Sequence, residues 1–130
     1  MTGTVRVEIA AGELIDKITI LEIKAERISD PAKRANVAEE LDSLSSARDA
    51  ALPASEELTR LTANLKAINE ELWEIEDAIR EYEGMQDFGS EFIRLARAVY
   101  KTNDCRAAVK REINLLLGSR LIEEKSYRPY

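Results

Sequence analysis

The most constraining feature of the sequence is a long helical repeat of apolar side chains between residues 58 and 82. Apolar residues recur there at alternating steps of three and four, a spacing that places them on one face of an α-helix. The stripe consists of Leu58, Leu61, Leu65, Ile68, Leu72, Ile75, Ile79 and Tyr82. A face of this length has to be buried against other helices, so the pattern predicts an all-α protein.

Capping signals and shorter stripes divide most of the chain into four helices. Ser55 is a suitable N-cap for the long stripe, and Gly84 is expected to end that helix in the left-handed conformation. Asp30 and Pro31 mark the start of another helix, which Pro53 ends. The predicted helices span residues 12–29, 31–51, 55–83 and 90–117. Joined by short turns, they are expected to form an antiparallel bundle of long helical hairpins.

Two segments fall outside these helices. Residues 5–9 alternate apolar and polar side chains, and this period of two predicts a short N-terminal strand. The apolar side chains on one face are Val5, Val7 and Ile9. Because a single strand is not stable alone, it is expected to pair with the tail at residues 119–130 or with a second copy of the chain. The whole chain, residues 1–130, is expected to form one domain.

Composition excludes several classes of protein. The chain has no histidine, one cysteine and a formal net charge of -6. Without histidine, neither a Ser-His-Asp nor a Cys-His catalytic site nor a His/Cys zinc site can form, so no catalytic residue, metal or cofactor is predicted. The negative charge argues against a general nucleic-acid binder. No apolar run is long enough for a membrane span, and a lone cysteine suits a reducing cytoplasm.

The last predicted helix carries polar residues where its apolar stripe should continue. Steps of four and three lead from Phe92 to Asn103, Arg106 and Lys110 before the stripe becomes apolar again at Ile113. In one interpretation the buried stripe simply drifts by one position. The drifted stripe would contain Val99, Thr102, Cys105, Val109 and Leu116.

Two other interpretations keep the polar side chains inside. They could form a structural polar core, because a buried charge needs a partner of opposite sign. Acidic candidates on facing helices are Asp16, Glu22, Glu76 and Asp77. Alternatively, donors left partly unpaired would form a site for a carboxylate or phosphate. The candidate ligand-binding residues are Lys24, Arg97, Asn103, Arg106 and Lys110.

Charge is distributed unevenly between the last two predicted helices. Residues 94–111 carry six basic side chains against Asp104 alone, a net charge of +5. Residues 55–83 carry three basic and nine acidic side chains, a net charge of -6. Adjacent antiparallel helices of opposite charge are expected to pair along their flanks.

Four stretches of the sequence resemble a family of small bacterial proteins that carries a domain-of-unknown-function label. They are "ELIDKITILEIKAERI", "NEELWEIEDAIR", "LARAVYKTNDCRAAVKREIN" and "EEKSY". The likeness covers nearly the whole chain and implies no particular activity or substrate.

The first predicted helix also faintly resembles the opening helix of the all-helical chorismate mutases. The resemblance rests on Leu14, Ile15, Asp16, Ile18, Glu22 and Arg27. Those enzymes hold a dicarboxylate with Arg and Lys side chains and use no protein nucleophile. Their pattern has a second arginine about 17 residues before the one at the helix end, where this chain has Ala10.

These features lead to two functional hypotheses. The first is a non-enzymatic cytoplasmic assembly or adaptor module that forms a homodimer. Its candidate interface residues are Trp73, Val5, Val7 and Ile9, because a Trp beside the apolar stripe and an unpaired strand both favour contacts with another chain. The alternative is a protein that binds a small anion such as a phosphate, sugar nucleotide or dicarboxylate, or an enzyme that acts by electrostatic catalysis in the basic middle of the last helix.

Overall fold

A computed structural model describes residues 3–130, which form four helices and no strand. The helices are α1 (Ala11–Arg27), α2 (Pro31–Ala51), α3 (Glu56–Gly84) and α4 (Ser90–Leu116). Their ends lie within two residues of the predicted ones, and the all-α prediction is confirmed. Residues 1 and 2 of the predicted domain lie outside the described part of the chain. None of the described helices is long and apolar enough to cross a membrane.

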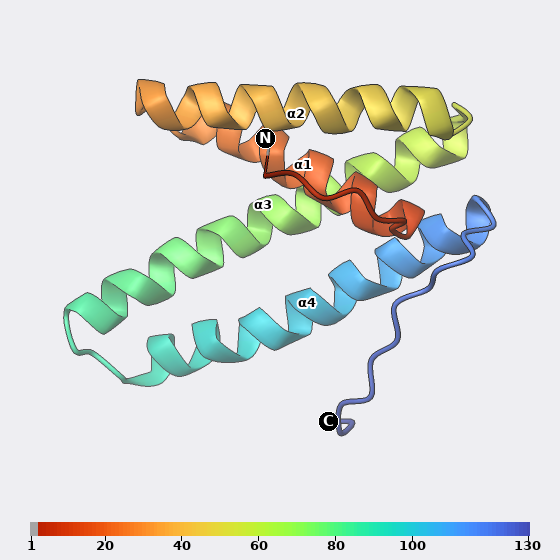
Figure 1. Ribbon diagram of the computed structural model, residues 1–130. Helices are drawn as coiled ribbons and strands as arrows, with labels where there is room; N and C mark the ends of the chain where they lie inside the picture. Colours follow the sequence, from red (N-terminus) through yellow and green to blue (C-terminus); the bar gives the residue numbers. More distant parts are fainter. Residues whose placement is uncertain (1–2) are drawn as a thin grey trace.

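α1 lies between α2 and the antiparallel hairpin formed by α3 and α4 (Figure 1). α2 contacts α1 but neither of the other described helices, and Val37 is its only buried residue. The packing is therefore two helical hairpins joined through α1, and the four helices do not enclose one common core. This matches the weak apolar pattern of α2, which has too few apolar side chains to pack against more than one neighbour.

The apolar core lies where α1 crosses the hairpin. Ile15 of α1 packs there with Leu61 and Leu65 of α3 and Ile113 of α4. Leu65 and Ile113 are completely buried. Burying side chains of this size stabilises the fold by about 1.5 to 3 kcal/mol each relative to leaving them exposed.

Local capping explains where α2 and α3 begin. The Asp30 carboxylate accepts a hydrogen bond from the Lys33 amide at 3.0 Å, and the Ser55 hydroxyl accepts one from the Leu58 amide at 3.1 Å. α1 begins differently, because Ala10 has no side chain that can accept. The side chain of Asn114 in α4 takes this role, and its oxygen accepts a hydrogen bond from the Gly12 amide at 2.7 Å. The start of α1 is thus fixed to the end of α4.

The same crossing requires glycine at position 12. A Cβ atom there would lie 2.3 Å from the backbone carbonyl oxygen of Lys110, far inside van der Waals contact. Glycine therefore lets the backbones of α1 and α4 approach closely at this point.

The predicted strand at residues 5–9 is wrong. Residues 3–10 have no strand pairing, and Val5 and Val7 are 83% and 72% exposed. The tail does approach this segment, where Arg120 forms an ion pair with Glu8, but the two segments form no backbone ladder within residues 3–130. Alternating apolar residues favour a strand only when a partner strand is present to accept their hydrogen bonds.

The prediction for Gly84 is also wrong. Gly84 is the last residue of α3, and the left-handed conformation falls on Gln86, whose φ is 54°. The turn closes when the Asp87 amide donates to the Tyr82 carbonyl at 3.0 Å. The chain therefore continues two residues beyond the expected stop before it reverses.

Candidate functional site

A buried polar network joins α1, α3 and α4 next to the apolar core. Its centre is Asp16, whose side chain is 1% exposed. Arg106 of α4 binds both oxygens of this carboxylate, with its Nε donating to Oδ1 at 2.9 Å and its Nη2 donating to Oδ2. Asn69 of α3 donates a third hydrogen bond, from Nδ2 to Oδ1, at 2.9 Å. A carboxylate on one helix is thus held by donors from two others.

Thr19 completes the network. Its hydroxyl donates to the Asp16 carbonyl oxygen at 2.8 Å and accepts from Asn69 Nδ2 at 3.0 Å. Within residues 3–130, no buried side-chain nitrogen or oxygen lacks a hydrogen-bond partner. The cost of burying these polar groups is offset by hydrogen bonds, as a stable interior requires.

The ionisation of Asp16 follows from these contacts. Burial raises its pKa, but the hydrogen bonds from Arg106 and Asn69 and the charges of Arg106 and Lys110 outweigh this effect. The net pKa of Asp16 therefore lies below its usual value. In turn, the hydrogen bond to Asp16 raises the pKa of Arg106. Asp16 remains a carboxylate at neutral pH, and its lowered pKa and hydrogen-bonded oxygens make it a weak proton acceptor.

Lys110 forms a second ion pair one helical turn away. Its Nζ lies 2.8 Å from a carboxylate oxygen of Glu13 and 3.4 Å from one of Glu123 in the tail. The Lys110 side chain is 12% exposed. Burial lowers the pKa of Lys110, but the hydrogen bond to Glu13 and the charges of Asp16, Glu13 and Glu123 raise it more, so the net pKa lies above its usual value.

The polar stretch of α4 thus combines the drifted apolar stripe with the structural polar core, two of the three interpretations of the sequence. Thr102 is buried as the drifted stripe predicts, but Cys105 and Leu116 on the same stripe are exposed. Arg106 meets Asp16, one of the four acidic partners that the sequence suggested. Glu76, by contrast, pairs with Arg80 on its own helix.

Sequence reasoning missed Asn69 and Thr19. Asn69 follows Ile68, which belongs to the predicted stripe, and Asn69 itself is not part of that stripe. Leu65, Asn69 and Leu72 nevertheless recur at steps of four and three, so they share one helical face. A polar side chain on a face otherwise apolar was the signal that could have identified Asn69.

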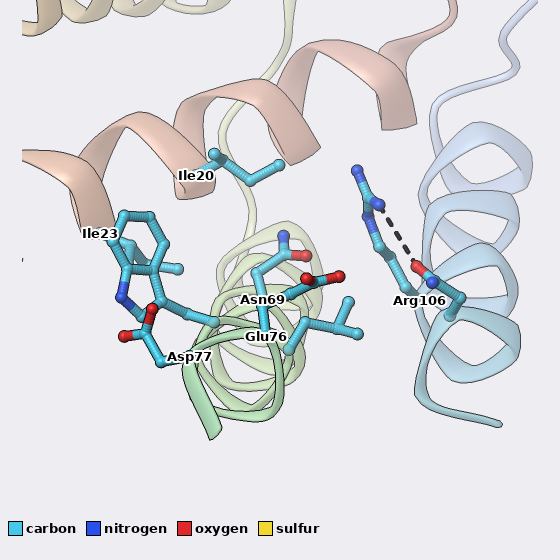
Figure 2. Close-up of a pocket in the computed structure, with 9 residues that line it drawn as sticks. Ile20, Ile23, Asn69, Glu76, Asp77 and Arg106 are labelled. Atoms are coloured by element: carbon cyan, nitrogen blue, oxygen red, sulfur yellow. Dashed lines mark hydrogen bonds between the residues drawn. The ribbon is translucent and has the colours of Figure 1, made fainter. Parts of the chain in front are cut away.

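A hollow of about 360 Å³ opens beside the network (Figure 2). Figure 2 shows Arg106 extending from α4 toward α1, with Asn69 beside it on α3. Arg106 and Asn103 both line this hollow, and Arg106 Nη1 donates to Asn103 Oδ1 at 3.4 Å. The other lining residues are Ile20, Ile23, Leu72, Trp73, Glu76 and Asp77. Trp73 is half-buried here, on the wall of the hollow.

The five candidate ligand-binding residues do not form one cluster. Asn103, Arg106 and Lys110 line a second, smaller and polar hollow of about 250 Å³. Arg97 is exposed and lines a separate hollow further along α4, and Lys24 is half-buried on α1 without lining either hollow.

The charges around Arg106 and Lys110 do not favour a strong anion site. Three carboxylates, those of Asp16, Glu13 and Glu123, contact these two cations. An incoming anion would have to displace a carboxylate that is already bound, and in the case of Asp16 would leave it buried without its partner. The arrangement is better suited to fixing the positions of three helices.

Metal binding and chorismate-mutase chemistry also lack a suitable arrangement here. Within residues 3–130, no group of three or more His, Cys, Asp or Glu side chains could hold a metal ion. Arg27, the arginine of the mutase resemblance, contacts Glu70 and Glu74 on α3, and Ala10 is buried at the start of α1. These residues therefore do not form the paired arginines of those enzymes.

Comparison with other proteins identifies a family but no activity. No curated protein and no solved structure matches the chain. Residues 5–129, nearly the whole chain, match a family of unknown function (DUF6165). The protein with this network of Asp16, Asn69 and Arg106 therefore belongs to the DUF6165 family.

Proposed function

We propose that the protein is a non-enzymatic cytoplasmic assembly or adaptor module that forms a homodimer through the outer half of its α3–α4 hairpin. The outer half comprises residues 75–101, which include the turn between the two helices. The supporting observation is that this half extends beyond α1 and exposes large apolar side chains.

Most of the outer half lies beyond the first two helices, although its start, at Glu76 and Asp77, lines the hollow beside α1. α1 ends at Arg27, whose side chain reaches Glu74 of α3, and α2 contacts α1 alone among the described helices. The turn end of the hairpin therefore projects away from α2 (Figure 1). Ile75 and Leu95 are still buried, because α3 and α4 pack against each other along this length.

Apolar side chains are nevertheless exposed on the outer half. Met85 is 64% exposed, and Phe88 and Ile93 are each 53% exposed. The rings of Phe88 and Phe92 stack edge to face with centroids 5.1 Å apart, which joins the turn to the first turn of α4. Clustered aromatic and apolar side chains on a surface are typical of protein interfaces.

Charge on the outer half favours a second copy as the partner. On α3 four acidic side chains outnumber Arg80, and on α4 three basic side chains outnumber Glu91. The acidic residues are Glu76, Asp77, Glu81 and Glu83, and the basic residues are Arg94, Arg97 and Lys101. Two-fold symmetry can place the acidic edge of one copy against the basic edge of the other. Such complementarity orients the partners and disfavours other pairings.

Two other features support this proposal, one for assembly and one for a cytoplasmic location. The N-terminal segment exposes Val5, Val7 and Ile9, which offer a further apolar strip to a partner. Cys105 is a free, exposed thiol, as suits a protein of the reducing cytoplasm.

The test is sedimentation or light scattering of the purified chain at micromolar concentration. We expect a dimer, and Ile93→Glu should raise its dissociation constant about tenfold or more, because a charge would be buried without a partner. Leu115→Glu is the matched control, since Leu115 is also an exposed apolar residue of α4, 62% exposed, but lies outside the outer half. A monomer at these concentrations, or equal weakening by both substitutions, would contradict the proposal.

A further inference from the structure

The end of α4 reverses the chain so that the tail runs back beside the helix. Gly118 adopts the left-handed conformation with φ of 62°. The Ser119 amide donates to the Asn114 carbonyl at 2.8 Å, and the Gly118 amide donates to the Leu115 carbonyl at 3.4 Å. These two bonds form a Schellman motif, which fixes the direction in which the chain leaves a helix. In Figure 1 the tail leaves the end of α4 and turns back on the side away from α2.

Two adjacent glutamates of the tail pair with two adjacent basic residues of α4. Glu123 lies 3.4 Å from Lys110, and Glu124 lies 3.1 Å from Arg111. Arg111 and Glu124 are largely exposed, so this pair is weakened by salt and contributes little to stability.

A tyrosine makes the other contact between the tail and α4. The Tyr130 hydroxyl donates to Asp104 Oδ2 at 2.6 Å, and the Tyr130 ring packs edge to face on Tyr100 with centroids 5.3 Å apart. The hydrogen bond to Asp104 raises the pKa of Tyr130 to about 12, so the hydroxyl remains a donor at neutral pH.

Between these contacts the tail does not pack tightly on α4. A hollow of about 310 Å³ lies beside Glu123 and Glu124, and another of about 790 Å³ lies beside Tyr127 and Tyr130. Tyr127 and Tyr130 are 78% and 77% exposed. The tail is therefore attached mainly by the ends of polar side chains, which another segment with the same groups could replace.

We propose that this face of α4 is a groove that binds an extended acidic segment of another protein, with the tail acting as an intrachain competitor. The groove is formed by Tyr100, Asp104, Lys110 and Arg111. Its occupant would carry two adjacent carboxylates and an aromatic hydroxyl six residues after the second, which is the spacing of Glu124 and Tyr130. This inference does not depend on self-association through the outer half of the hairpin.

The competition can be tested in the full chain. In the double variant Glu123→Lys and Glu124→Lys, the tail should be repelled from Lys110 and Arg111 and leave the groove open. The probe is a fluorescent synthetic peptide with the sequence of residues 119–130, and its anisotropy measures binding. We expect the double variant to bind this peptide about tenfold or more tightly than the unaltered chain does, because its own tail no longer competes.

A charge exchange distinguishes the groove from nonspecific attraction. A peptide with Glu124→Lys should bind the double variant weakly, and adding Arg111→Glu to that variant should restore its binding. Circular dichroism and melting would show that each variant is folded. Equal binding of the peptide to unaltered and double-variant chains, or no effect of Arg111→Glu on either peptide, would overturn the proposal.

Independent evidence comes from trypsin cleavage after Lys125 of the tail. Cleavage should be faster in Tyr130→Ala than in the unaltered chain, since a docked segment resists the extended conformation that a protease requires. Equal cleavage rates in the two chains would show that the tail is not docked and would also count against the groove.

Discussion

The Asp16 carboxylate accepts three side-chain hydrogen bonds within the network. It is nearly inaccessible to solvent, yet its charge is retained because Arg106 and Asn69 supply hydrogen bonds from two different helices. The sequence suggested that Arg106 would need an acidic partner and named Asp16 among four candidates. The sequence does not show which of the four pairs with Arg106. Helix periodicity predicts which face of a helix is buried, but not how far one helix is displaced along another.

Ionisation of Asp16 should make stability depend on pH in the acidic range. Its pKa is depressed in the folded chain, so its stabilisation is complete above the unfolded pKa, about 3.9, and is lost as pH falls through the folded value. The loss amounts to about 1.4 kcal/mol for each unit of depression. Urea denaturation at several pH values should show this decline in the unaltered chain and a smaller one in Asp16→Asn.

Asp42 provides the control for this measurement. It is an exposed residue of α2, so Asp42→Asn should leave the acid dependence almost unchanged. If Asp16→Asn and Asp42→Asn gave the same pH profile, the stabilising role of the Asp16 ion pair would be disproved.

Gly12 is a second position at which one atom determines the packing. In Gly12→Ala, the new Cβ would clash with the Lys110 carbonyl oxygen, so α1 and α4 would have to separate. We expect a loss of about 1 to 3 kcal/mol in the free energy of unfolding, the range typical of overpacking. Gly84→Ala is the control, because a Cβ there meets no atom within 4 Å and should stabilise α3 by about 0.5 kcal/mol or more. Equal effects in chemical denaturation would contradict this account of Gly12.

At the scale of elements, the helices could be predicted because their signals are local. The Asp30 and Ser55 caps are short-range hydrogen bonds, and both form as expected. The strand at residues 5–9 could not be decided locally, because a strand needs a partner and none of the described residues supplies one. The start of α1 could not be predicted from local signals either, because the side chain that caps it is Asn114, which is 102 residues from Gly12 in the sequence.

α2 should be the least stable of the four helices. It packs on α1 alone among the described helices, and only Val37 is buried, so opening it exposes little apolar surface. In native-state hydrogen exchange, we expect the most protected amides of α2 to exchange about tenfold or more faster than those of α1 between Leu14 and Ile23. Loss of protection in both helices at the same denaturant concentration would show instead that they unfold as one unit.

At the scale of the whole molecule, the sequence predicted the class of fold better than the arrangement of its helices. An antiparallel bundle was expected, and the α3–α4 hairpin has that form. The separation of α2 from α3 and α4 depends on small differences in packing, since its intermediate residues Leu41 and Leu44 would suit several neighbours. The location of the candidate site could not be predicted from residue type either. Lys24 and Arg97 are basic like Arg106 and Lys110, but they lie elsewhere in the structure.

The three-helix coordination of Asp16 also bears on how the chain avoids wrong alignments. An apolar stripe can slide along another by one turn, about 5.4 Å, and still find apolar neighbours. Such a slide of α4 would carry Arg106 out of reach of Asp16 and leave an uncompensated charge in the interior, which is strongly unfavourable. Misaligned packings are thereby penalised, so the ion pair selects one alignment of the helices even if it adds little to the stability of the correct one.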